Sequence, residues 1–166
     1  MNQANTREKI TSISAVFPAY NDGGSIASMV SAASIALRQV SNDFEIVVVN
    51  DGSSDYTAIV LEELQCKYPE LRVIHHPLNK GYGAALRTGF AAATKDWVFY
   101  TDGDSQYNPL ELTLLADALR DGVDAVNGYK LSRNDSIIRT IIGRAYHNFV
   151  KLFFGIRIRE VDCDFR

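Results

Sequence analysis

Two carboxylates separated by one glycine, Asp102 and Asp104, closely follow the short apolar run Trp97–Tyr100. The aromatic and β-branched run is typical of a buried strand, so its carboxyl end would carry both side chains to an edge of a sheet. Ligands of open α/β folds bind at that edge. A Mg²⁺ or Mn²⁺ ion between the carboxylates and a phosphate would relieve their repulsion, and the amide oxygen of Gln106 would suit the same ion. Read alone, the pair is more typical of a turn, because Asp and Gly favour turns.

Three more polar, glycine-bearing loops follow apolar runs in the same way, and four such loops indicate a site more strongly than any one of them. They carry candidate site residues at Pro18, Tyr20 and Asp22, at Asp51 and Ser53, and at Lys80. The carboxylate of Asp51 would accept hydrogen bonds from the N–H groups of a nucleobase. The same loop is also typical of a turn in which Asp55 or Ser53 caps the next helix, and one loop can do both.

Several other chemistries find little support in the residue pattern. The loop around Lys80 lacks the GxxxxGK[ST] pattern of a phosphate loop, so its glycines indicate close backbone approach at a helix start. No serine pairs visibly with a histidine and an acid, so nucleophilic hydrolysis is not indicated. The histidines lack zinc spacing and are expected on the surface or in the core. Cys66 and Cys163 are expected to be free thiols in a reducing compartment.

Strand-like and helix-like segments alternate through the first three quarters of the chain. This order predicts βαβ units and a mostly parallel sheet flanked by helices, in an α/β domain. Doubly wound sheets often reverse strand order beside the first strand, which would place Asp22 next to Asp102. The expected strands are Ile13–Phe17, Glu45–Val49, Leu71–His75, Trp97–Tyr100 and Asp124–Val126, and the expected helices are Ser25–Leu37, Thr57–Tyr68, Ala84–Ala93 and Leu110–Leu119.

Length and charge limit the choice of function class. With 166 residues, 46% of them hydrophobic, we expect a flexible segment over residues 1–12 and a single domain over residues 13–166. A net charge of −3 argues against a general nucleic-acid binder. Residues 130–160 nevertheless carry seven basic and two acidic side chains. Residues 134–154 are predicted to form a basic amphipathic helix, either packed on the sheet or lying at a membrane surface.

The ends of the chain give two further expectations. There is no apolar secretory signal and no run of about 20 apolar residues that would cross a bilayer. We therefore expect a cytoplasmic location, with the cytoplasmic face of a membrane as an option. The last residues, 161–166, look like the start of another element, which indicates a C-terminally truncated domain.

Five motifs, taken in order, resemble those of family-two glycosyltransferases with a GT-A fold. Within that family, the likeness is strongest to polyprenyl-phosphate sugar transferases of the dolichyl-phosphate mannose or glucose synthase type. Two departures are Asn50, where the family usually has Asp, and Asp22, where it usually has Glu. The motifs are Pro18–Asn21, Asn50–Asp55, Asn79–Gly81 with Gly83, Asp102–Asp104 with Gln106, and Asp162–Arg166.

The resemblance implies a role for each candidate residue. Asp102 and Asp104 would be catalytic, and with Gln106 they would hold Mg²⁺ or Mn²⁺ at the donor diphosphate. Asp102 would also approach the ribose. The other nucleotide-binding residues would be Pro18, Tyr20, Asp22, Asp51, Ser53 and Lys80, and the cations at the phosphates or the acceptor would be Lys130, Arg133 and Arg166.

The implied reaction is a metal-dependent, inverting transfer of a sugar from a UDP- or GDP-linked donor to a polyprenyl phosphate. The acceptor oxygen is already anionic, so it needs cations rather than a strong general base. Transfer to a sugar hydroxyl during polysaccharide assembly stays open and would need a base. A nucleotidyltransferase and a non-catalytic nucleotide-sugar-binding module are the remaining alternatives.

Overall fold

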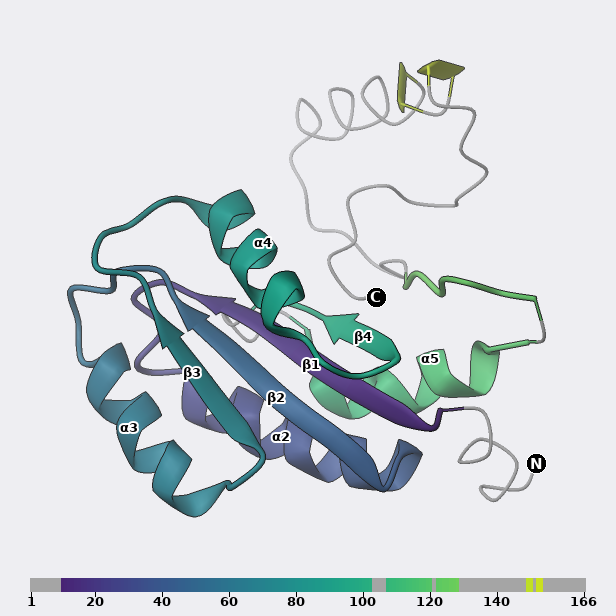
Figure 1. The fold of residues 1–166 in the computed structure, drawn as a ribbon, viewed down its shortest axis with the longest axis horizontal. Coiled ribbons are helices and arrows are strands. Elements are labelled where there is room, and N and C mark those ends of the chain that lie inside the picture. The colour runs from purple at the N-terminus through teal and green to yellow at the C-terminus, as the bar shows by residue number, and fades with distance from the viewer. Residues whose placement is uncertain (1–9, 103–106, 121, 129–148, 151, 154–166) are drawn as a thin grey trace, which may run out of the picture.

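The computed structural model describes residues 10–102, 107–120, 122–128, 149–150 and 152–153 (Figure 1). Strands and helices alternate along most of this length, as the sequence predicts. The elements are β1 (Ser12–Ala19), α2 (Ile26–Val40), β2 (Asp43–Asn50), α3 (Thr57–Lys67), β3 (Leu71–His75), α4 (Tyr82–Ala92), β4 (Trp97–Tyr100), the 3₁₀ helix η1 (Pro109–Glu111) and α5 (Leu112–Ala118).

The four strands of the described residues form one parallel sheet in the order β3-β2-β1-β4. Strand β1 pairs with β2 over its whole length, from Ser12 opposite Asp43 to Ala19 opposite Asn50. On its other side, β1 pairs with β4, and Val16 lies opposite Tyr100. The strand order therefore reverses beside β1, which confirms the expected neighbourhood of the first and fourth strands and is the arrangement that creates a ligand crevice.

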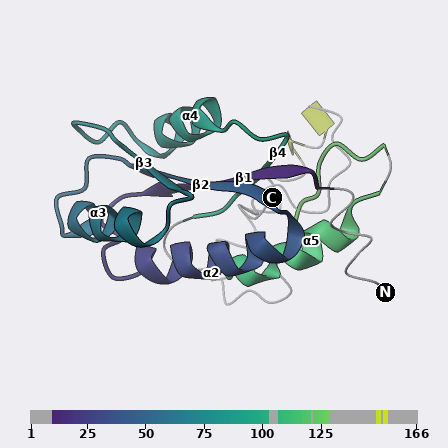
Figure 2. The ribbon, with the colours of Figure 1, turned by 60° about the horizontal axis from the view of Figure 1, so that its bottom comes forward.

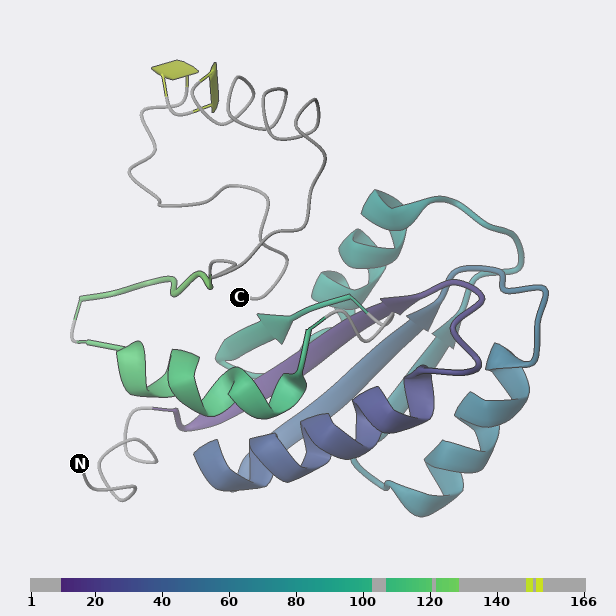
Figure 3. The same ribbon diagram turned by 180° about the vertical axis from the view of Figure 1, so that it is seen from behind.

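Helices cover both faces of the sheet. Helix α4 lies on one face, while α2, α3 and α5 lie on the other (Figures 2 and 3). The carboxyl ends of β1, β2 and β3 all point toward the same end of the sheet, where the loops to α2, α3 and α4 begin (Figure 1). The loops that carry the candidate residues are therefore gathered at one edge.

Alternating side chains on the strands build a core on each face. Ala15 and Phe17 belong to the larger cluster, which faces α2, whereas Val16 and Val47 belong to the smaller cluster under α4. Gly89 allows α4 to lie close to the sheet, because a Cβ at this position would collide with the side chain of Val16. The central strands β1 and β2 are thus largely buried on both faces, as expected for a parallel sheet.

The structure corrects one sequence prediction. Residues 124–126 are not a strand; Val123 and Val126 pack against the core while the two residues between them are exposed, a spacing that lacks the alternation of a strand. At the start of the described residues, Ile10 is buried in the core and Ser12 is the first residue of β1.

The predicted amphipathic helix over residues 134–154 lies largely outside the described residues. Residues 149–150 and 152–153 within it are helical, and the rings of Phe149 and Phe153 stack with centroids 5.6 Å apart. Across the described part of the chain, no helix has both the length and the apolar character needed to cross a membrane.

Candidate functional site

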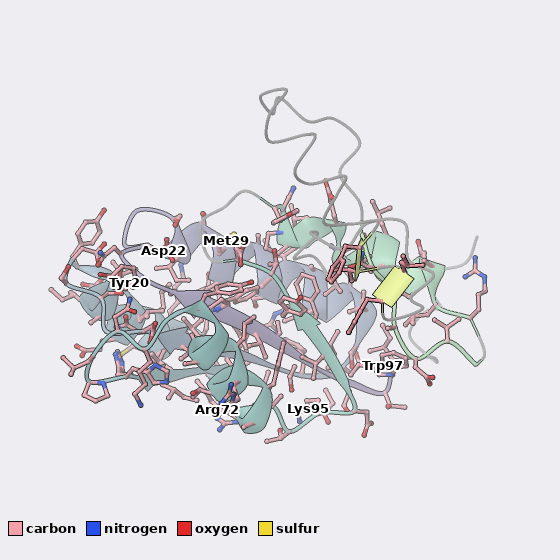
Figure 4. All side chains as sticks on the ribbon, turned by 90° about the horizontal axis from the view of Figure 1, so that it is seen from above. Tyr20, Asp22, Met29, Arg72, Lys95 and Trp97 are labelled. Atoms are coloured by element: carbon pink, nitrogen blue, oxygen red, sulfur yellow. The ribbon has the colours of Figure 1, made fainter. Side chains whose placement is uncertain are left out.

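A cavity of about 300 Å³ opens at the carboxyl edge of the sheet. Tyr20 and Asp22 lie toward this end of the molecule, while Trp97, the first residue of β4, lies toward the other (Figure 4). The wall combines small residues, two tyrosines and three carboxylates. Its lining residues are Pro18, Ala19, Tyr20, Asp22, Asp51, Asn79, Tyr82, Ala85 and Asp102. Five of the residues predicted to bind a nucleotide thus surround one cavity.

Asp51 is held in this wall by three hydrogen bonds. Its Oδ1 accepts hydrogen bonds from Nδ1 of His76 at 2.5 Å and from the backbone N–H of Lys80 at 3.0 Å, and its Oδ2 accepts from the backbone N–H of Gly81 at 2.8 Å. Burial alone would raise the pKa of Asp51, but the hydrogen bonds from His76, Lys80 and Gly81 outweigh it and lower that pKa. The side chain is therefore an ionised acceptor at neutral pH.

Asp51 also anchors the loop that leads into α4. Gly81 immediately precedes this helix with φ +90°, a left-handed conformation that glycine adopts without a steric penalty. Lys80 reaches Asp51 through its backbone and is not among the residues that line the cavity. Asn79 does line the cavity, and its side-chain oxygen accepts a hydrogen bond from the Gly81 N–H at 3.0 Å.

Asn21 joins the loop after β1 to the loop after β2. It adopts φ +57°, and its side-chain oxygen accepts hydrogen bonds from the backbone N–H groups of Ser54 and Asp55 at 2.8 and 3.3 Å. In return, the Asn21 N–H donates to the hydroxyl of Ser53 at 3.0 Å. Ser53 is absent from the cavity wall, so the structure gives it a part in shaping the loop that presents Tyr20.

Tyr20 and Asp22 present two different chemistries to the cavity. The Asp22 carboxylate accepts a hydrogen bond from the Tyr20 N–H at 2.9 Å, which fixes the turn between them. Tyr20 is 49% exposed, and Tyr82 at the start of α4 is 47% exposed. Two accessible aromatic rings in a cavity that also holds carboxylates suit a flat ligand that offers hydrogen-bond donors.

Asp102 follows β4 and lines the same cavity. Because β4 pairs with β1, this carboxylate comes beside the loop that holds Asp22. The Asp102 carboxylate supplies the kind of oxygen that Mg²⁺ and Mn²⁺ prefer. The described residues contain no cluster of three or more His, Cys, Asp or Glu side chains around a metal position. The other predicted ligands and cations, Asp104, Gln106, Lys130, Arg133 and Arg166, lie outside the described residues.

Sequence reasoning missed several members of the site. Asn79, Tyr82 and Ala85 belong to the wall, and their place in the loop and first turn before and within α4 is the signal that could have found them. His76 was expected to be a surface or core residue, and its contact with Asp51 depends on the pairing of β2 with β3.

Comparison with protein families gives a match to glycosyl transferase family 2 over residues 14–160. An undecaprenyl-phosphate 4-deoxy-4-formamido-L-arabinose transferase of Pectobacterium carotovorum is 31% identical over 96% of this chain and 49% of its own length. The enzyme of that name from Proteus mirabilis is also 31% identical, over 97% of this chain and 50% of its own length. The chain thus spans about half the length of these curated relatives.

Solved structures show the same architecture. Glucosyl-3-phosphoglycerate synthase of Mycobacterium tuberculosis, solved with UDP, aligns with a TM-score of 0.71 over 98% of this chain and 58% of its own, at 21% identity. A complex of that synthase with Mn²⁺, UDP and glucosyl-3-phosphoglycerate aligns at 27% identity and a TM-score of 0.54 over 69% of this chain and 41% of its own. The fold is that of the GT-A glycosyltransferases. The chain belongs to glycosyl transferase family 2.

Proposed function

We propose that this chain binds a nucleotide-diphosphate sugar together with a divalent cation and transfers the sugar to a polyprenyl phosphate. The observation that carries the proposal is the single cavity around Asp51 and Asp102, which gathers predicted nucleotide-binding residues from three separate loops at the carboxyl edge of a family 2 fold. Strand β1 separates β2 from β4, so the two carboxylates follow strands on either side of it.

The positions of Asp51 and Asp102 on either side of β1 suggest how the donor would lie. The nucleobase would enter at Asp51, whose carboxylate accepts an N–H, and would stack on the ring of Tyr20. Asp22 and Pro18 would border the ribose. The diphosphate would then reach Asp102, which with Asp104 and Gln106 would hold Mg²⁺ or Mn²⁺. When bound, such an ion offsets the negative charge that grows on the leaving diphosphate.

The relatives support a lipid phosphate as acceptor. Those of Pectobacterium carotovorum and Proteus mirabilis are named as transferases acting on undecaprenyl phosphate. An anionic phosphate oxygen attacks the anomeric carbon without a strong base, and the bond to the donor diphosphate breaks on the opposite side, which inverts the configuration. Lys130, Arg133 and Arg166 would offset repulsion between the two substrates. A lipid acceptor would place the reaction at the cytoplasmic face of a membrane.

The test is a transfer assay with UDP- and GDP-linked sugars and undecaprenyl phosphate in detergent micelles, with release of UDP or GDP as the readout. We expect turnover with one donor class in the presence of Mn²⁺ or Mg²⁺ and its loss on chelation. Asp102→Asn should lower the rate at least about a hundredfold, because it removes charge stabilisation where the leaving group forms. Glu63→Gln makes the same chemical change on the exposed surface of α3 and should leave the rate unchanged.

Measurement of nucleotide binding on the same samples separates the two parts of the proposal. Metal-dependent binding without any turnover would leave a donor-binding module and refute transfer by this chain. No binding of either nucleotide would contradict the proposed site itself.

A further inference from the structure

His76 is a buried histidine beside the cavity for which the proposed reaction has no use. It lies just after β3, and its side chain is 6% exposed. Its Nδ1 is 2.5 Å from Oδ1 of Asp51, and its Nε2 is 2.9 Å from the hydroxyl of Thr88 on α4. The three side chains therefore form a connected series that crosses from β2 to α4 behind the cavity wall.

The partners of His76 determine which ring nitrogen carries the proton. Asp51 is ionised, because its hydrogen bonds lower its pKa, and an ionised carboxylate only accepts. Nδ1 of His76 must therefore be the donor. In the neutral ring Nε2 is then an acceptor, which the O–H of Thr88 fills as donor. One tautomer thus gives both ring nitrogens of His76 a hydrogen-bond partner.

The same hydrogen bonds limit what Asp51 can offer to a ligand. A carboxylate has about four acceptor positions, two on each oxygen. Those of Oδ1 are used by His76 and by the N–H of Lys80, and one of those of Oδ2 is used by the N–H of Gly81. One acceptor position remains on Oδ2 of a side chain that lines the cavity.

We infer that His76 is a positioning residue for the nucleobase. Held by Thr88, it fixes the rotation of the Asp51 carboxylate, so that the remaining acceptor of Oδ2 meets one ring N–H of the base. This inference rests on the proposed function, since it takes Asp51 to contact the base. Without the donor from His76, only the backbone N–H groups of Lys80 and Gly81 hold the carboxylate, so it can rotate and lose its alignment with the ligand.

A set of paired variants tests this role in the intact chain. His76→Asn retains a donor close to the position of Nδ1, whereas His76→Leu removes it. Thr88→Ser keeps the hydroxyl and Thr88→Val replaces it with a methyl group of similar shape. The control is His75→Leu, since His75 is exposed and contacts the side chain of Asn50 instead. All variants are first compared by thermal unfolding.

The readout is the dissociation constant of UDP and of GDP with Mn²⁺, measured by calorimetry on folded protein. For the nucleotide that wild type prefers, His76→Leu should bind about tenfold or more weakly, as expected for loss of a hydrogen bond to a charged group. His76→Asn, Thr88→Ser and His75→Leu should stay within about threefold of wild type, and Thr88→Val should fall between. If the chain also turns over sugar, the change should appear in KM and leave kcat unaltered.

Other results would overturn the role of His76 or the proposed function. Folded His76→Leu with wild-type affinity would overturn the inference, because a purely structural histidine affects stability and not binding. Failure of the wild type to bind either nucleotide would instead contradict the proposed function. If His76→Leu does not fold, the Thr88 pair decides: equal affinity of Thr88→Val and Thr88→Ser overturns the role of the series.

A spectroscopic measurement checks the proton assignment independently of binding. Long-range ¹H–¹⁵N spectra distinguish the two neutral tautomers of a histidine. We expect His76 to be protonated at Nδ1 in the wild type and in Thr88→Ser. Protonation at Nε2 alone would contradict the donor role toward Asp51.

Discussion

The side-chain oxygen of Asn21 lies 2.8 Å from the backbone nitrogen of Ser54, so the loop after β1 is fastened to the loop after β2. The loop after β2 is held in turn against the next loop, because Gly52 lies too close to Leu78 and Asn79 for any side chain to fit. The three loops therefore support one another as a continuous rim. A cavity of this kind can bind a flat ligand without first ordering its own wall.

Replacement of Gly52 should test how much the rim depends on close packing. In Gly52→Ala the new Cβ would collide with the backbone of Asn79, at a φ of +67° that disfavours alanine. We expect a loss of about 2 kcal/mol or more in the free energy of unfolding, measured with urea. Gly83→Ala is the matched control, because no atom lies near its new Cβ and it sits within α4. This control should be neutral or slightly stabilising, and equal losses in the two variants would contradict the account.

Asn21 should contribute to nucleotide affinity and to stability through both its left-handed conformation and its hydrogen bonds. Asn21→Gly keeps the left-handed conformation but removes the acceptor for the N–H groups of Ser54 and Asp55, whereas Asn21→Ala loses both. We expect nucleotide affinity to be highest in the wild type, lower in Asn21→Gly and lowest in Asn21→Ala. We also expect Asn21→Ala to be about 1 kcal/mol less stable to unfolding than Asn21→Gly. Calorimetry and thermal unfolding give the two quantities. Wild-type affinity in Asn21→Ala would show that the loop connection has no part in binding.

Glu45 lies near the amino end of β2, at the edge of the sheet opposite the cavity. Its lowered pKa predicts how the stability of the fold depends on pH. Burial would raise its pKa, but hydrogen bonds from Ser14, Thr94 and Arg72 lower it from 4.5 to about 2. A lowered pKa means that the ionised form stabilises the fold above pH 4.5 and that this contribution is lost as the pH falls toward 2. The shift corresponds to about 3 kcal/mol at neutral pH.

The measurement for Glu45 is urea unfolding between pH 7 and pH 2.5. Glu45→Gln should be less stable than wild type at pH 7, and the difference should shrink with acidification as the wild-type carboxyl becomes protonated. Glu63→Gln, on the exposed surface of α3, serves as control and should match wild type throughout. A difference for Glu45→Gln that stays constant with pH would exclude the ionised network as its cause.

Local sequence patterns predict the elements of this protein better than they predict its contacts. β3 and β4 have the bounds expected from their apolar runs, because each run ends where polar loop residues begin. Residues 124–126 fail as a strand because two valines three positions apart reach the core while their neighbours do not. The composition of such a short run does not show this spacing.

At the candidate site too, the residues are easier to predict from the sequence than their contacts. Tyr20, Asp22, Asp51 and Asp102 could be predicted, since polar residues after parallel strands converge on one edge. The structural roles of Ser53 and His76 could not be predicted, because they depend on which loops are in contact. Their partners lie 32 and 25 positions away along the chain, beyond the reach of any local pattern.

The most direct test of the central claim is to locate nucleotide binding on the protein by ¹⁵N-resolved NMR during titration with UDP and GDP in the presence of Mg²⁺. We predict saturable shifts of the Lys80 and Gly81 amides, which Asp51 binds, and of the Asn21 amide in the adjoining rim. The amides of Thr94 and Asp96, which bond to Glu45 and Ser12 at the opposite edge, should not move. Shifts confined to that opposite edge, or no saturable shift with either nucleotide, would contradict a nucleotide-sugar site at the carboxyl ends of the strands.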